Sequence, residues 1–294
     1  MTTINVNTAY QICLTQAQAH YENFPTATRL INKKHRLATA AIYSFARRAD
    51  DIADEGDSDT QTRHQQLDAY QTMLDNVYRG TTCNDATFIA LADTIQNYDL
   101  PQQPFNDLLT AFRTDIDKTR YANFDELQEY CHHSADPIGE LILRLHGLYN
   151  DITTPASNNI CSALQLINFI QDIDEDYQQR DRIYIPLDEM QQYHIEEQHI
   201  ANRVNSPQMQ DLVNTQLTRA TNMLNDGIIL LSSLNGRLKL TVNMTIRSGL
   251  RIADKLRLRQ NPFSRPTLNK KDWLLIILHS LYFRPNTQHA KLHS

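Results

Sequence analysis

The segment ICSALQLINFIQDIDED, residues 160–176, joins an apolar helical repeat to an acidic end. Its apolar side chains recur every three or four residues, as on one face of an α-helix: Ile160, Ala163, Leu164, Ile167, Ile170 and Ile173. A four-residue step turns a helix by about 400°, so residues four apart differ by only about 40° around the axis. We therefore expect Asn168, Asp172 and Asp176 to share one helix face.

A second segment, AIYSFARRADDIAD at residues 41–54, has the same design and ends with Asp50 and Asp54 four residues apart. Like charges so placed repel each other unless a cation lies between them. Both faces offer only oxygen ligands, which suit Mg²⁺. Residues 41–54, which carry the first acidic face along the chain, are by themselves equally compatible with a solvated helix end. Residues 160–176, which carry the second acidic face, are less so, because Asn168 and Asp172 lie among hydrophobic residues.

The composition predicts an all-α protein. The chain has only 7 glycines in 294 residues, where average usage of about 7% predicts roughly twenty. No alternating Val/Ile/Thr-rich segment bounded by turn dipeptides is found, so strands are not expected. Because no linker, repeat or low-complexity block interrupts the chain, we predict a single domain over residues 1–294.

Helical periodicity and capping residues predict the element boundaries. One long helix with a kink at Pro137 is expected over residues 124–149. Thr154-Pro155 is interpreted as the N-cap and first residue of the helix carrying the second acidic face. The remaining helices are expected at residues 8–21, 34–54, 61–78, 85–97, 104–117, 207–234, 237–259 and 272–283.

Charge and cysteine usage restrict the partners and the compartment. The net charge of −6 argues against nucleic acid as the main partner, because phosphate backbones require a basic surface. The four cysteines lack metal or redox spacing and are typical of a reduced, cytoplasmic protein. No signal-peptide pattern is found near Met1, and the longest apolar run, residues 273–278, is too short to span a bilayer.

The C-terminal region is basic between Arg251 and Lys271 and is followed by Trp273 and several leucines. Two interpretations remain open. The stretch could dock on anionic lipid headgroups, which would place the protein at the inner face of the membrane as a peripheral protein. Alternatively, it forms ordinary solvated helix faces and an amphipathic core helix.

The two acidic faces would form one reaction site if they faced each other across a helical bundle. Mg²⁺ ions held there would bridge protein oxygens to a diphosphate and make it a good leaving group. An apolar cavity below the metals would hold a hydrocarbon chain and keep water from a carbocation. Phe24, Tyr43 and Phe45 are candidates for stabilising that cation with their aromatic rings.

These residues resemble the squalene/phytoene synthase family of head-to-head terpene synthases. Residues 41–54 look like the family's first aspartate motif, and residues 164–176 look like the second, followed by the usual RIYIP at residues 182–186. HYENF at residues 20–24 falls where the family has an early substrate-binding segment. The likeness covers nearly the whole chain and implies an isoprenoid synthase bundle around a central apolar cavity.

Within the family, three local segments are similar to the hydroxysqualene synthase branch of hopanoid biosynthesis. They are ENFP at residues 22–25, KTRY at residues 118–121, and YC at residues 130–131 followed by SADPIG at residues 134–139. Asp136 departs from this branch, where Asn is frequent before the proline. Ser248-Gly249 stands where many squalene and phytoene synthases have a tyrosine near the diphosphate.

The resemblance implies a reaction and the residues that perform it. Presqualene diphosphate would be ionised with Mg²⁺, and water would capture the rearranged cation as hydroxysqualene, which a separate flavin enzyme of the squalene pathway would reduce. The implied ligands of Mg²⁺ and diphosphate, which form the catalytic set, are Asp50, Asp54, Asn168, Asp172 and Asp176. The implied substrate-binding residues are His20, Asn23, Phe24, Tyr43, Arg47, Gln165, Gln171, Arg182 and Arg265. His20 is also compatible with an ordinary helix-end histidine.

Two other functions remain open at this point. A family enzyme that condenses two prenyl diphosphates to presqualene diphosphate or phytoene would share the same metal site. A non-catalytic scaffold relative would be expected to lose metal-binding aspartates, and here both acidic faces are complete.

Overall fold

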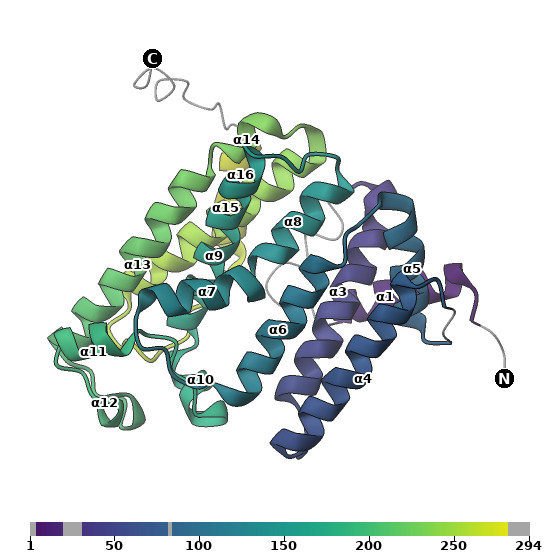
Figure 1. Ribbon diagram of the computed structural model, residues 1–294. Helices are drawn as coiled ribbons and strands as arrows, with labels where there is room; N and C mark the ends of the chain where they lie inside the picture. Colours follow the sequence, from purple (N-terminus) through teal and green to yellow (C-terminus); the bar gives the residue numbers. More distant parts are fainter. Residues whose placement is uncertain (1–3, 20–30, 82–83, 282–294) are drawn as a thin grey trace.

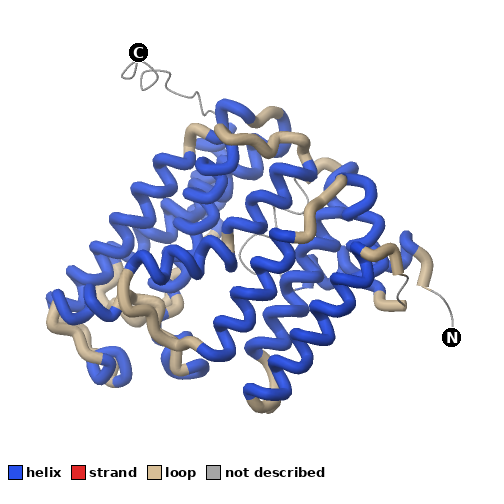
Figure 2. Tube along the Cα trace, viewed as in Figure 1, coloured by secondary structure: helices blue, strands red, loops and turns tan. Residues whose placement is uncertain are grey.

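The computed structural model describes residues 4–19, 31–81 and 84–281, which form helices joined by loops (Figures 1 and 2). No strand occurs in these ranges, where the only bridge-like pairing joins Arg120 and Ile183. The all-α prediction is confirmed. No helix of the described ranges is long and apolar enough to cross a membrane.

The N-terminal half supplies the helices on the right of Figure 1, where α1 packs against α3 and α5. Buried side chains of α3, α4, α5 and α6 form one core around Phe45, Tyr70, Phe88 and Phe105. The helices of this half are α1 (Val6–Ala19), α3 (Lys33–Asp54), α4 (Thr60–Tyr78), α5 (Ala86–Tyr98) and α6 (Gln103–Asp117).

The C-terminal half builds a second core, in which α13 lies along α9. Its helices are α7 (Phe124–Ser134), α8 (Asp136–Leu145), α9 (Thr153–Gln171), α10 (Ile173–Arg180), α11 (Leu187–Gln192), α12 (Glu197–Ala201), α13 (Pro207–Gly227), α14 (Leu230–Ser233), α15 (Gly236–Leu258) and α16 (Lys270–Leu281). Helix α8 links the halves, because Leu141 belongs to the first core and Leu143 to the second. The single-domain organisation itself stays a prediction.

Three predicted helices differ from the structure. The expected helix over residues 124–149 is two helices that meet at Ala135, because Pro137 has no N–H to donate and occupies the first turn of α8 instead. The helix with the second acidic face begins at Thr153 rather than at Pro155. There Asn150 Oδ1 accepts from the amides of Ile152 and Thr153, so the predicted cap at Thr154 was wrong.

The second acidic face is also split. Asp172 ends α9 with φ −107° and ψ 13°, and α10 starts at the next residue. The hydrogen bonds from Asp172 N to Asn168 O (2.9 Å) and from Asp176 N to Asp172 O (2.8 Å) keep the chain close to helical. The expected helix over residues 207–234 likewise divides into α13 and α14. The short helices α11 and α12 were not anticipated, since five or six residues are too few to show a repeat.

Candidate active site

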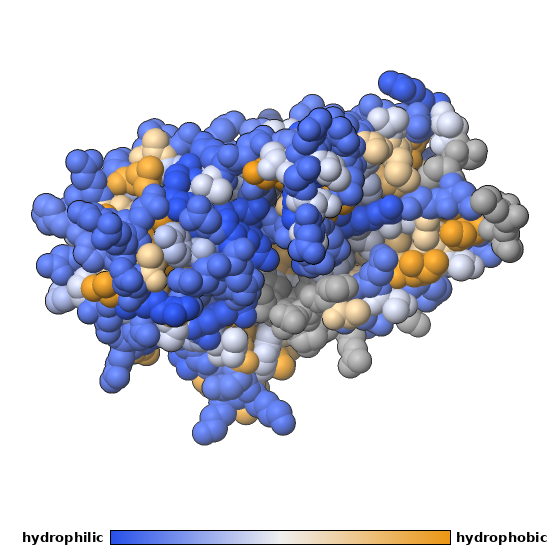
Figure 3. Space-filling view, turned by 90° about the horizontal axis from the view of Figure 1, so that it is seen from below, coloured by the Kyte–Doolittle hydropathy of each residue, from blue (hydrophilic) through white to orange (hydrophobic). Residues whose placement is uncertain are grey.

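The two acidic segments come together at one end of the molecule. The C-terminal end of α3 and the whole of α10 both lie toward the lower edge of Figure 1. Figure 3 views the molecule from this side, and hydrophilic residues dominate the surface, with hydrophobic residues scattered among them. This end of the bundle is therefore suited to a charged ligand.

Two arginines from the second acidic region contact Asp54 of the first face, and one of them also contacts the second face. Arg182 donates to both carboxylate oxygens of Asp54, from Nη2 at 2.7 Å and from Nη1 at 3.1 Å. Arg180 Nε lies 3.1 Å from Asp54 Oδ2, and its Nη1 lies 3.9 Å from Asp176 Oδ1. Since the guanidinium of Arg180 contacts a carboxylate from each face, the two acidic faces lie next to each other, as expected.

Arg47 and Arg265 each pair with carboxylates of one acidic segment only. Arg47 contacts Asp50 (Nη1–Oδ2, 3.2 Å) and Asp51 (Nε–Oδ1, 2.6 Å) on its own helix. Arg265, from the loop between α15 and α16, pairs with Asp172 across 93 residues of sequence. The cations that the like-charged aspartates require are therefore arginines of the same chain in this structure.

Two further carboxylates of residues 160–176 also contact arginines. Glu175 lies 3.6 Å from Arg265 Nε, and Asp174 pairs with Arg203 at the surface (Nε–Oδ1, 2.5 Å). Arg203 lies in the loop after α12, so the pair anchors that loop to α10 and leaves Asp172 and Asp176 to the site.

Two of the aspartates are held at unusual pKa values. Burial, followed by the nearby charge of Asp54, raises the pKa of Asp50 to about 6. Burial, followed by the charge of Asp172, raises the pKa of Asp176 to about 7. Both shifts oppose ionisation, so each carboxylate would gain from a further cation placed between the two faces.

The oxygen ligands of the site suit Mg²⁺, but the protein side chains alone do not complete its coordination. In the described ranges, no three acidic, histidine or cysteine side chains are grouped so as to hold a metal by themselves. Mg²⁺ usually binds through one or two carboxylates together with waters and substrate phosphates. A site of pairwise carboxylates that is completed by a diphosphate agrees with this pattern.

Sequence reasoning missed a buried carboxyl group beside the site, Asp115 of α6. Tyr130 OH donates to both of its oxygens (2.7 and 2.9 Å), and Tyr184 OH lies 3.3 Å from Oδ1. The backbone oxygen of Asp115 accepts from Arg182 Nη2 at 2.7 Å. Burial raises the pKa of Asp115 to about 7, although Arg182 lowers it. The only available signal was that both tyrosines fall within segments already compared with the family.

Aromatic rings gather behind this network. Phe169 and Tyr184 stack with centroids 3.8 Å apart, and Tyr130 lies 5.8 Å from Tyr184. Phe45, which was expected near the cation, is fully buried among Tyr70, Phe88 and Phe105 and contacts the core instead. That expectation was wrong because the helix turns Phe45 away from the acidic face.

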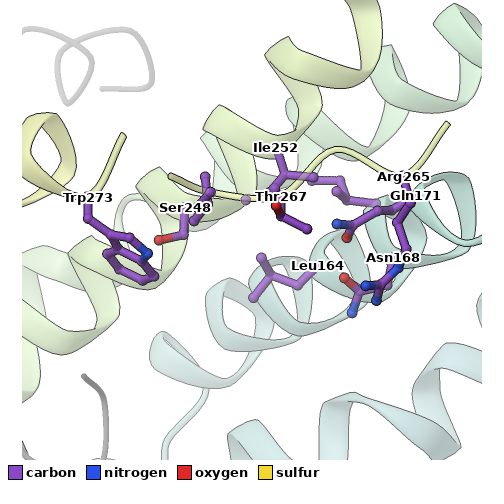
Figure 4. Close-up of a pocket in the computed structure, with 11 residues that line it drawn as sticks. Leu164, Asn168, Gln171, Ser248, Ile252, Arg265, Thr267 and Trp273 are labelled. Atoms are coloured by element: carbon purple, nitrogen blue, oxygen red, sulfur yellow. The ribbon is translucent and has the colours of Figure 1, made fainter. Parts of the chain in front are cut away.

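A cavity of about 180 Å³ leads away from the acidic site along α9 (Figure 4). Asn168, Gln171 and Arg265 lie at one end of it and Trp273 of α16 at the other. Leu164, Ile167, Ser248, Gly249, Ile252, Thr267 and Leu268 also line it. It is smaller than the about 300–1,000 Å³ of pockets that hold drug-sized ligands. This cavity is therefore too small to be the apolar cavity that was expected to hold the hydrocarbon chain.

A separate recess of about 740 Å³ lies at the opposite end of α3 from Asp54. Its lining includes Lys34, His35, Asp93, Arg144 and His146. Such polar and charged groups would have to lose their hydration against a hydrocarbon. This recess is therefore unsuited to the apolar part of a lipid.

Four of the nine expected substrate-binding residues lie at these features: Arg47, Gln171, Arg182 and Arg265. Gln171 is buried and donates from Nε2 to Pro266 O (2.7 Å), which ties the loop carrying Arg265 to α9. Tyr43 and Gln165 are half-buried on α3 and α9, and Gln165 does not line the 180 Å³ cavity. His20, Asn23 and Phe24 lie outside the described residues, so their predicted roles stay predictions.

Comparison with known proteins gives consistent results. The squalene/phytoene synthase family model matches residues 17–272. A hydroxysqualene synthase of Sinorhizobium fredii is 32% identical over 255 residues, which cover 86% of each chain. A 15-cis-phytoene synthase of Synechocystis sp. is 30% identical and covers 76% of this chain and 68% of its own. The crystal structure of squalene synthase HpnC from Alicyclobacillus acidocaldarius aligns with a TM-score of 0.81 and 30% identity, over 89% of this chain and 97% of that one.

Proposed function

Because this chain belongs to the squalene/phytoene synthase family, whose members are enzymes that process isoprenoid diphosphates, we propose that it converts presqualene diphosphate to hydroxysqualene and diphosphate. The observation that carries this proposal is the meeting of the two acidic helix ends, in which Arg180 contacts both Asp54 and Asp176. The likeness to a hydroxysqualene synthase over most of both chains supports this branch of the family.

Binding of the substrate would exchange one set of ion pairs for another. Asp50, Asp54, Asn168, Asp172 and Asp176 would hold Mg²⁺, which supplies charge neutralisation for the departing diphosphate. Arg47, Arg182 and Arg265 now pair with these carboxylates and would turn to the diphosphate oxygens, which Arg can bind with two parallel hydrogen bonds. The aspartates and arginines that pair with each other in the free protein would thus part, the aspartates binding Mg²⁺ and the arginines binding diphosphate.

The reaction then needs the diphosphate to leave, the carbon–carbon bonds of the cyclopropane ring to rearrange and open, and water to add. The carbon–oxygen bond of presqualene diphosphate breaks, and its electron pair leaves with diphosphate. The cyclopropylcarbinyl cation rearranges, a water oxygen bonds to it, and that water loses a proton. The aromatic rings of Phe169, Tyr130 and Tyr184 lie behind the acidic site, where their faces would stabilise positive charge.

The terminating step is tested with presqualene diphosphate and Mg²⁺ alone. We expect an alcohol, with ¹⁸O from labelled water in its hydroxyl group, and no change in rate or product when NADPH is added. No glycine-rich dinucleotide turn occurs in the sequence, which favours water over hydride. Squalene formed on addition of NADPH, or an unlabelled alcohol, would assign the chain to a different branch.

A second candidate is the condensation of two prenyl diphosphates, which the likeness to a 15-cis-phytoene synthase favours. Incubation with farnesyl diphosphate or geranylgeranyl diphosphate separates the two candidates. Turnover of either one in the absence of presqualene diphosphate would support the condensation. A non-catalytic scaffold role is the least compatible with the chain, because both sets of carboxylates are complete.

A further inference from the structure

Helix α16 turns an apolar stripe away from the protein. Leu274, Ile277, Leu278 and Leu281 follow the i, i+3, i+4, i+7 pattern of one helix face and are between 37% and 62% exposed. Leu275, beside the stripe, is 47% exposed. In an ordinary surface helix this pattern marks the side that packs on the core.

The inward side of α16 is instead anchored by polar contacts. Asp272 is buried and accepts from Arg251 Nε (2.7 Å) and from Lys255 Nζ (2.5 Å) of α15. Asn243 Nδ2 of α15 donates to Ser280 O at 3.3 Å. These contacts fix the rotation of the helix at both of its ends. The outward position of the apolar stripe therefore follows from specific bonds within the fold.

The charge around α16 identifies the kind of surface that the stripe fits. Residues 236–281 contain ten lysines and arginines and only two acidic residues, Asp254 and Asp272, in a chain whose net charge is −6. Lys270 and Lys271 are exposed in the first turn of α16. An outward apolar helix face flanked by basic residues is typical of helices that lie in the interface of an anionic bilayer.

We propose that α16 is a docking surface for an anionic lipid bilayer. Leu274, Ile277, Leu278 and Leu281 enter the boundary between headgroups and acyl chains, while Lys270 and Lys271 pair with lipid phosphates. Trp273 of the same helix lines the cavity whose other end is formed by Asn168 and Arg265 (Figure 4). The docked helix thereby brings this cavity next to the membrane. The role of the cavity in the reaction rests on the proposed function, whereas docking itself does not.

The chain contains one tryptophan, Trp273, which reports on α16 without labelling. The full-length protein is mixed with vesicles of phosphatidylcholine alone or of phosphatidylcholine with phosphatidylglycerol. We expect sedimentation with the anionic vesicles, release in high salt, and quenching of Trp273 by lipids brominated on their acyl chains. Unquenched fluorescence with bound vesicles would show that another surface docks and would overturn the proposal.

Variants then distinguish binding through the apolar stripe from non-specific binding by exposed hydrophobic residues. Leu274→Ser with Leu278→Ser should lower binding to anionic vesicles at least about tenfold, because two side chains leave the interface. Lys270→Glu with Lys271→Glu should do the same only where the lipid is anionic. The matched control is Ile152→Ser with Val204→Ser, whose side chains are 74% and 37% exposed on other parts of the surface. Binding equal to the unmodified protein in the stripe variant would refute docking by α16.

The same variants test the alternative that a second copy of the chain covers the apolar stripe of α16. If the stripe variant changes a dimer to a monomer in sedimentation velocity, with vesicle binding intact, α16 is a subunit interface and the lipid proposal is wrong. Turnover of detergent-dispersed presqualene diphosphate keeps the two proposals apart. We expect it to be unchanged in the stripe variant. Docking without turnover would refute the proposed function alone.

Discussion

At the residue scale, the behaviour of the site depends on which carboxylates have arginines for partners and which mainly face one another. Asp54 and Asp172 each accept from an arginine. Asp176 has only a long contact with Arg180, and its pKa is raised to about 7. In the free protein the aspartates of the site therefore still repel one another, and a bound cation would relieve this repulsion.

Replacing an aspartate of the site should separate activity from stability. We expect Asp50→Asn or Asp176→Asn to lower turnover on the order of 10²-fold or more, because leaving-group stabilisation is lost. The thermal midpoint of the metal-free protein should stay equal or rise, since a like charge is removed. Asp174→Asn is the control, as Asp174 pairs with Arg203 outside the site. Full turnover in the Asp50 and Asp176 variants would refute the ligand assignment.

Asp115 makes stability depend on pH. Its pKa is about 7 in the folded protein, against an ordinary value of 3.8, so the folded state binds the proton more tightly than the unfolded chain. This contribution to stability is fully present below about pH 4 and is lost as pH rises through 7, by at most about 1.4 kcal/mol per pH unit.

We therefore expect the metal-free protein to melt at a higher temperature at pH 5.5 than at pH 8. Asp50 and Asp176 act in the same direction, because their pKa values are also raised. Asp115→Asn should make the dependence shallower, and Asp125→Asn, at an exposed position of α7, should leave it unchanged. A slope of opposite sign in the unmodified protein, or an unaltered slope in the Asp115 variant, would contradict the assignment.

At the scale of elements, two glycines allow helices to approach α9. A Cβ added to Gly227 of α13 would lie 2.9 Å from the backbone oxygen of Ala156 and 2.5 Å from Ile160 Cγ1. A Cβ added to Gly249 of α15 would lie 2.6 Å from Leu164 Cδ2, a side-chain methyl that lines the cavity. The first contact needs the backbone to move, and the second only a side chain.

Replacing these two glycines with alanine should therefore affect different properties, stability in one variant and activity in the other. Gly227→Ala should lower the free energy of unfolding by about 1–3 kcal/mol, because overpacking displaces α13 from α9. Gly249→Ala should change it less, since the gain in helix propensity of about 1 kcal/mol offsets the contact. Its kcat/KM should fall as Leu164 moves into the cavity. Denaturant unfolding and steady-state kinetics measure both, and equal stability losses would contradict the difference.

At the scale of the whole molecule, the ligand completes the contact between the halves. Asp54 belongs to a helix of the N-terminal half, and Arg180, Arg182 and Asp176 belong to the C-terminal half. A diphosphate held with Mg²⁺ between them would bind the folded state alone. Such binding stabilises by about 2.7 kcal/mol at one hundred times the dissociation constant.

We expect Mg²⁺ together with inorganic diphosphate to raise the thermal midpoint by several degrees, whereas either one alone raises it much less. Turnover should need Mg²⁺ and disappear with a chelator. Asp54→Asn should abolish most of the joint stabilisation, and Asp68→Asn, an exposed aspartate of α4, should retain it. Stabilisation by diphosphate in metal-free buffer, equal to that with Mg²⁺, would show that the arginines alone hold the ligand.

The sequence by itself determined the fold class, most helix limits and the two acidic faces. These features are local: an apolar repeat and a four-residue spacing of Asp50 and Asp54 depend only on helix geometry. The breaks at Ala135 and Asp172 were missed, because a proline within a repeat marks a disturbance without giving its position, and a single non-helical residue leaves the repeat intact.

Only the tertiary structure decided which charges neutralise each other and what lies behind them. Arg182 reaches Asp54 across 128 residues, and Asp115 meets Tyr184 across 69. The outward rotation of the apolar stripe of α16 was likewise undetermined, because an apolar repeat fits a core and a membrane equally well. Such pairings arise from the packing of helices distant in sequence, and no local spacing encodes them.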